Sequence, residues 1–109
     1  MNETILFFSD DDIGTGTGTG SYKASRFMGI DQVNADTVDF YFKNQDYIDG
    51  EENSVRCNFS GAFKDLARAV AGVINSKKAF VVMADSTNGI YFSYPGGALL
   101  GDPVLTQTA

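Results

Sequence analysis

The chain has 109 residues and contains no histidine, a single cysteine and two prolines. The absence of histidine excludes Ser–His and Cys–His catalytic pairs and every metal site that needs an imidazole ligand. The single cysteine excludes an internal disulfide and a zinc site built from clustered cysteines. Basic residues are also scarce, because eight Lys and Arg stand against fourteen Asp and Glu, a net charge of −6. This balance argues against nucleic-acid binding through a broad basic face.

Long apolar runs and a basic N-terminal segment are missing as well. No stretch approaches the roughly 20 apolar residues of a membrane-spanning helix. We therefore expect no membrane contact. No basic residues precede the first apolar run, so we also expect no signal peptide. The hydrophobic content of 43% is sufficient for one packed core. Cys57 fits a reducing compartment, and we expect it to be a small buried hydrophobic residue.

Charge is unevenly distributed along the chain. Residues 1–55 contain 11 acidic and 3 basic residues, whereas residues 56–109 contain 3 acidic and 5 basic residues. This distribution favours solubility, and it would also allow the acidic half of one copy to contact the basic half of the next. The sequence leaves both interpretations open.

Glycine is abundant, and four of the twelve glycines alternate with threonine in residues 14–20. A dinucleotide-binding loop would need its third glycine at Thr19 and a helix directly afterwards, and neither is present. A P-loop is also excluded, because no Gly-Lys-Ser/Thr ends the run. We therefore interpret residues 9–20 as a long inserted loop. Alternating threonine favours an extended strand, so we expect the run to reach and pair with a neighbouring chain.

Two acidic clusters raise the question of a bound cation. Their members are Asp10, Asp11 and Asp12, and then Asp49, Glu51 and Glu52. Neither cluster has the ligand spacing of an EF-hand. We interpret both as solvated loop charge, and whether the first cluster binds a cation stays open. The sequence predicts no catalytic residues, no cofactor and no metal site.

The first half of the chain contains three kinds of strand signal. Residues 4–8 are almost continuously apolar, which predicts a short strand. Residues 21–28 are a further strand candidate, followed by an expected turn over 29–35. Residues 37–43 and 55–59 alternate strictly between apolar and other residues, which indicates two half-buried strands that pair antiparallel.

The second half begins with a change from a two-residue to a helical period. The apolar residues at helical spacing are Phe63, Leu66, Ala67, Val70, Val73 and Ile74. Ser60 is the expected N-cap. Residues 79–84 predict a buried strand, and Asn88-Gly89 predicts a tight turn into a returning strand over 90–94.

The order of these segments predicts an α+β fold with a mainly antiparallel sheet of about five to six strands and one amphipathic helix on one face. We expect a single domain over residues 1–95 and an extended C-terminal arm over 96–109. One helix covers only one face, yet 4–8 and 79–84 are apolar on both faces. The C-terminal tail, a second layer of strands or a neighbouring subunit would have to cover the other.

Three segments resemble small structural proteins from the virions of tailed phages. They are the strand Thr37-Val-Asp-Phe-Tyr-Phe-Lys43, the helix Phe63-Lys-Asp-Leu-Ala-Arg-Ala-Val-Ala-Gly-Val-Ile-Asn-Ser76 and the strand Ala79-Phe-Val-Val-Met-Ala-Asp85. The resemblance implies a capsid decoration (cement) protein or another repeated virion component, often oligomeric. It implies a virion location after assembly in the host cytoplasm, and it supplies no catalytic residues.

The leading hypothesis is therefore a non-enzymatic virion protein that stabilises the capsid through subunit contacts. Its partners would be further copies of itself and the major capsid protein, with no nucleic acid and no membrane. The expected contact residues lie in the Gly/Thr loop and the C-terminal arm: Thr15, Thr17, Thr19, Leu99, Leu100, Val104 and Leu105. The alternative is a small acidic module that binds a basic partner through residues 31–52.

Overall fold

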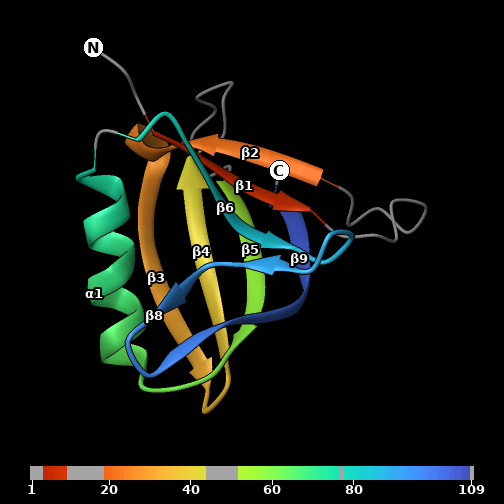
Figure 1. Ribbon diagram of the computed structural model, residues 1–109. Helices are drawn as coiled ribbons and strands as arrows, with labels where there is room; N and C mark the ends of the chain where they lie inside the picture. The colour runs from red at the N-terminus through yellow and green to blue at the C-terminus, as the bar shows by residue number, and fades with distance from the viewer. Residues whose placement is uncertain (1–3, 10–18, 44–51, 77, 109) are drawn as a thin grey trace.

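The structure is a computed structural model that describes residues 4–9, 19–43, 52–76 and 78–108 (Figure 1). The described residues form one α-helix, one 3₁₀ turn and nine strands. In chain order these are β1 (Ile5–Ser9), β2 (Thr19–Lys23), η2 (Ala24–Arg26), β3 (Phe27–Asn34), β4 (Thr37–Lys43), β5 (Glu52–Phe59), α1 (Phe63–Ile74), β6 (Phe80–Asp85), β7 (Ile90–Tyr91), β8 (Ser93–Tyr94) and β9 (Gly97–Thr108).

The strands form two sheets. Sheet A has the order β2-β1-β6-β7, and sheet B has the order β3-β4-β5-β9-β8. All neighbouring strands are antiparallel except β1 and β6, which are parallel. The prediction of an α+β fold with mainly antiparallel pairing and one helix is confirmed. The strands predicted to be apolar on both faces, β1 and β6, lie in sheet A, and sheet B is a second layer of strands that covers one of these faces.

The alternating segment 37–43 forms β4 over the predicted residues. Val38, Phe40 and Phe42 are fully buried, whereas Lys43 is exposed. β5 pairs with β4 so that Val55 lies opposite Phe40. Because facing residues on paired strands point to the same side, the apolar residues of both strands meet on the inner face of sheet B.

Aromatic side chains join the two sheets. The ring of Phe8, on β1, lies 5.5 Å from Phe40 and 6.2 Å from Phe42. Tyr22, on β2, stacks on Phe42 at 4.4 Å, and Phe27 contacts the edge of the same ring. Each such pair adds about 0.5–1.5 kcal/mol beyond the burial of area. The contacts of Phe8 and Tyr22 hold β1 and β2 of sheet A against β4 of sheet B.

The helix α1 connects sheet B to sheet A and packs on the shared core through Leu66 and Val70. The ring of Phe63, at its first residue, lies 6.4 Å from that of Phe59. The predicted helix is confirmed, but the predicted cap is wrong. Ala62 is the N-cap and makes no side-chain cap bond, because the hydroxyl of Ser60 instead accepts a hydrogen bond from the N–H of Ala98.

The predicted turn over residues 29–35 is wrong. Residues 27–34 form β3, the edge strand of sheet B, which pairs with β4 through two register shifts. The 3₁₀ turn η2 separates it from β2, so the segment 21–28 is divided between two different sheets. Phe27 and Ile30 of this strand pack against the core, but the two register shifts interrupt the alternation by which a strand is predicted from its sequence.

The C-terminal segment is extended, as predicted, but it is a strand of the domain. β9 runs over residues 97–108 and pairs with β5 along nearly its whole length, and with β8 at its start. Residues 96–109 are therefore not a free arm, at least through Thr108. The separation of a domain ending at residue 95 from an arm is accordingly wrong for the described part of this segment. The physical reason is that β5 has an open edge whose backbone groups need partners.

The start of β9 lies very close to the turn before α1. A Cβ atom added at Gly97 would overlap the carbonyl oxygen of Ser60, and one added at Gly61 would come within 2.6 Å of the carbonyl oxygen of Gly96. The hydroxyl of Tyr94 donates to the same Ser60 carbonyl at 2.7 Å. Only glycine allows two backbone segments to approach this closely.

Candidate functional site

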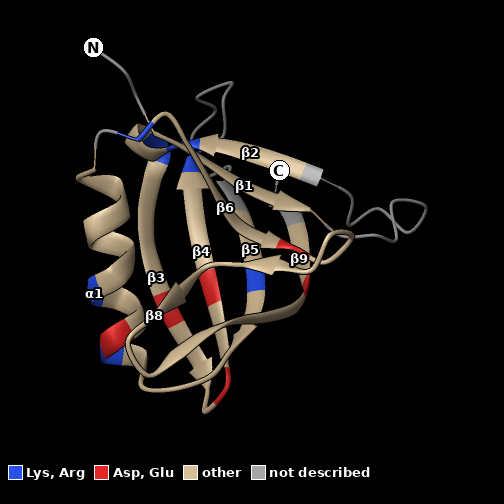
Figure 2. Cartoon of the chain, viewed as in Figure 1, with Lys and Arg blue, Asp and Glu red and all other residues tan. Residues whose placement is uncertain are grey.

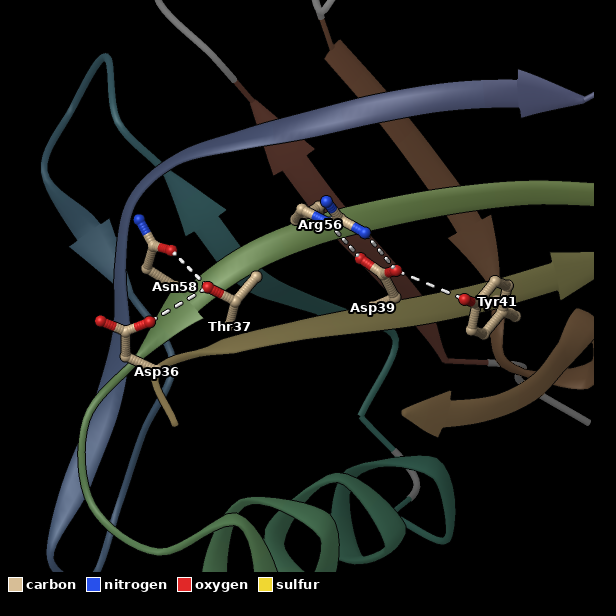
Figure 3. A network of polar contacts seen from close by, with 6 residues as sticks. All are labelled: Asp36, Thr37, Asp39, Tyr41, Arg56 and Asn58. Atoms are coloured by element: carbon tan, nitrogen blue, oxygen red, sulfur yellow. Dashed lines mark hydrogen bonds and ion pairs between the residues drawn. The ribbon is translucent and has the colours of Figure 1, made fainter. Parts of the chain in front are cut away.

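The outer face of sheet B, which points away from sheet A, carries a polar network (Figure 3). On this face Asp39 of β4 lies directly opposite Arg56 of β5. The guanidinium Nε and Nη2 of Arg56 donate to the two carboxylate oxygens of Asp39 at 2.8 and 3.0 Å. The hydroxyl of Tyr41 donates to the same carboxylate at 3.3 Å. Both oxygens of Asp39 are therefore engaged within the sheet.

This network determines the protonation of Asp39. Hydrogen bonds from the Arg56 guanidinium hold the pKa of the Asp39 carboxyl below its usual range, in spite of the burial of that side chain. The same contact raises the pKa of Arg56. The ionised Asp39 carboxylate accepts hydrogen bonds from Arg56 and Tyr41. We therefore interpret the Asp39–Arg56 pair as a structural contact between β4 and β5 that compensates the charge of a buried acid. The neighbouring hydroxyl of Thr37 lies 3.2 Å from oxygens of both Asp36 and Asn58.

Cys57 lies on the opposite, inner face of β5. It is 1% exposed, and burial raises the pKa of its thiol to about 12. The prediction that Cys57 is a buried hydrophobic residue is confirmed. Because the thiolate is the reactive form, a thiol with this pKa is not a nucleophile near neutral pH.

The structure separates the predicted contact residues into three groups. Thr15 and Thr17 lie outside the described residues. Thr19 begins β2, and its backbone pairs with Ser9 of the same chain. The pairing that the structure shows for Thr19 is therefore within the domain, whereas the sequence predicted pairing with a neighbouring chain.

The four predicted contact residues of the C-terminal segment alternate between the two faces of sheet B. Leu99 is fully buried in the core, and Leu105 is partly buried against it. Leu99 is therefore not available to a neighbouring subunit, and its selection as a contact residue is wrong. Leu100 and Val104 are 44% and 41% exposed, opposite Asn58 and Arg56 on the outer face. These two remain candidates for contact.

The outer face of sheet A also exposes apolar side chains, although none of its residues was among the predicted contact residues. Ile5 and Phe7 of β1 lie opposite Phe80 and Val82 of β6, and the rings of Phe7 and Phe80 are 5.4 Å apart. Phe80 is 55% exposed, and Ile90 of β7 is 51% exposed. The signal in the sequence was the continuous apolar character of residues 4–8 and 79–84.

Charged residues gather at opposite ends of sheet A (Figure 2). Lys23 ends β2 opposite Ile5, and Lys78 lies two residues before β6; both are exposed. At the other end Asp85 lies opposite Ser9. Its carboxylate accepts hydrogen bonds from the backbone N–H and the Nδ2 of Asn88 at 3.2 and 2.9 Å. Sheet A is therefore apolar across its centre, with basic residues at one end and an acidic residue at the other.

Within the described residues, no three Cys, Asp or Glu side chains come together as metal ligands. The acidic cluster of Asp10, Asp11 and Asp12 lies outside those residues, as do Asp49 and Glu51. In the part of the chain that the structure describes, no helix is long and apolar enough to cross a membrane.

Comparison with known proteins adds no relative to these observations. No protein-family model, no curated protein and no solved structure matches the chain.

Proposed function

We propose that the protein is a non-enzymatic structural component that acts through protein–protein contacts, and that its setting is a virion, as a capsid decoration (cement) protein. The observation that carries the contact role is the apolar outer face of sheet A. A small domain that leaves Phe80 and Ile90 more than half exposed on one continuous sheet face has a surface suited to a protein partner. The virion setting is supported by the resemblance of the segments 37–43, 63–76 and 79–85 to phage structural proteins.

The chemistry of the polar groups is consistent with this role. The most deeply buried acid of sheet B, Asp39, is occupied by Arg56 and Tyr41. The thiol of Cys57 lies in the core with a raised pKa. Both groups contribute to the structure of the domain. We therefore assign the function to its surfaces.

Quantitative mass spectrometry of purified particles tests the virion setting. A decoration protein is expected at a copy number comparable to that of the major capsid protein. Co-sedimentation of the purified chain with expanded capsids, which lack it, tests the contact directly. Absence from the particles together with failure to sediment with capsids would overturn the proposal.

A second proposal, an acidic module that binds a basic partner, is favoured by one specific contact. Asp31 of β3 lies directly opposite Asp39 of β4, and facing like charges destabilise a strand pair. Because Arg56 already pairs with Asp39, a basic side chain from a partner would pair with Asp31, which is exposed. Titration with a lysine-rich peptide, compared between the wild-type chain and Asp31→Asn, tests it. Equal affinities, or no binding, would exclude this site.

A further inference from the structure

The outer face of sheet A has the properties of a surface that is complementary to itself. Its centre is apolar, because Phe7 lies opposite Val82 there, and Phe7 also contacts Phe80 at the end near Lys23. Lys23 and Lys78 lie at one end, and Asp85 lies at the other, about 13 Å from the level of Lys23 along the strands by the rise of an extended chain. Among the described residues at these two ends, each end thus carries charge of one sign (Figure 2).

We propose that two copies of the chain pair through the outer face of sheet A, with the basic end of each copy facing the acidic end of the other. The contact follows from a two-fold axis that lies in the plane of the interface and crosses the strands near Phe7. This axis turns the strands end for end and leaves Phe7 and Val82, which lie opposite each other, near the centre, whereas an axis along the strands would place like charges together. Contacts around a two-fold axis are formed twice from one surface, so such a surface must be self-complementary.

Charge complementarity favours a second copy over an unrelated partner. The proposed arrangement brings Lys78 at the start of β6 toward Asp85 at the end of the same strand in the second copy. Asp85 is 6% exposed, so we expect it to attract the lysine of the second copy through its electrostatic field and not through a direct ion pair. Opposite charges at the rim of an interface determine orientation and association rate more than affinity.

The size of the face sets the expected strength. Three strands of five or six residues and the two-residue β7, spaced about 4.8 Å apart, present roughly 270 Å². This is less than the roughly 800 Å² per partner of a standard stable interface. We therefore expect a reversible dimer with a Kd on the order of 10 µM to 1 mM. This inference rests on the proposed contact role, but it concerns association in solution and not the presence of the chain in virions.

Sedimentation-velocity centrifugation of the full chain from about 5 µM to about 2 mM, which brackets the expected range, measures this equilibrium. We expect Phe80→Asp to raise the Kd at least about tenfold, because the substitution replaces an exposed aromatic ring of the face with a charge. Lys78→Glu is expected to weaken the dimer less, and less again in high salt, because the rim charges are screened. Two matched controls lie on other surfaces: Val104→Asp on sheet B and Lys64→Glu on the helix. Both should leave the Kd unchanged.

Three results would overturn the proposal. The first is a wild-type chain that stays monomeric over the whole range. The second is a dimer weakened by Val104→Asp and not by Phe80→Asp, which would move the contact to sheet B. The third is a monomer whose capsid binding is lost in Phe80→Asp, which would assign the face to a different protein while leaving the proposed function intact. Circular dichroism of each variant verifies that the fold is retained.

Discussion

Leu99 and Leu100 are adjacent in sequence but lie on opposite faces of β9, and this difference gives the sharpest test of the fold. Leu99 is fully buried beside Phe59, whereas Leu100 is 44% exposed beside Asn58. If residues 97–108 were a free arm, truncating either leucine to alanine would leave the isolated chain equally stable. If they form a strand of sheet B, only Leu99→Ala should destabilise it.

The magnitude follows from the burial of the two side chains. A fully buried leucine truncated to alanine costs about 2–5 kcal/mol, because transfer energy is lost and a cavity remains. A domain of this length has a total stability of about 5–15 kcal/mol. Leu99→Ala should therefore lower the melting temperature by roughly 10–20 °C. Leu100→Ala, at an exposed position, should change stability by no more than about 0.5 kcal/mol.

Urea and thermal unfolding followed by far-ultraviolet circular dichroism measures both values. The protein concentration should be low and equal in all samples, because self-association makes the melting temperature depend on concentration. Leu100→Ala is the matched control for Leu99→Ala. Equal and small effects at the two positions would refute the placement of β9 in the core. A large effect at Leu100 alone would mean that the register of β9 on β5 is shifted by one residue.

Three further predictions concern single side chains. Arg56 lowers the pKa of Asp39 in the folded chain, so the stabilisation from this carboxylate is present above its unfolded pKa of about 4 and is lost as the pH falls below that value. Asp39→Asn should therefore be less stable than the wild type at pH 7, and urea melts at pH 3 should show a smaller difference between the two. Gly97→Ala should destabilise the chain, because the new Cβ would overlap the Ser60 carbonyl, whereas Gly72→Ala, in an open helical position, should stabilise it by about 0.5–1 kcal/mol. Thermal melts in which Gly97→Ala is the more stable variant would contradict the close approach of β9 to the turn before α1. Burial raises the pKa of Cys57 to about 12, so the stability of the chain should fall as the pH rises above the pKa of about 8.5 that the thiol has in the unfolded chain. A disulfide reagent should react with this thiol only as fast as the chain unfolds, and rapid labelling in native buffer would contradict its burial.

Local patterns predicted the elements that bury one apolar face. The alternation of residues 37–43 predicted β4, and the helical spacing from Phe63 to Ile74 predicted α1, because each pattern follows from the geometry of one element alone. The same reasoning found the strands near residues 4–8 and 79–84. It also placed Cys57 correctly in the core.

Elements stabilised by long-range pairing were harder to predict. β3 has no regular alternation of apolar and polar residues, because two register shifts interrupt its pairing, and it is a strand because β4 offers it a free edge. β9 contains Gly97, Gly101 and Pro103, which locally favour irregular structure, yet it pairs with β5 over most of its length. Likewise, no local pattern distinguishes Leu99 from Leu100 until the register with β5 is known.

The amino-acid sequence by itself determined the composition of the core, the positions of the helix and the alternating strands, and the absence of histidine- and disulfide-based chemistry. Tertiary structure decided how the strands divide between two sheets, which leucines of β9 face the core, and which apolar face stays exposed. The physical reason is that amphipathic periodicity is local, whereas the exposure of a sheet face depends on which distant segments cover it. Sheet B is covered on its inner face by sheet A and α1, and sheet A keeps Phe80 and Ile90 at its outer surface.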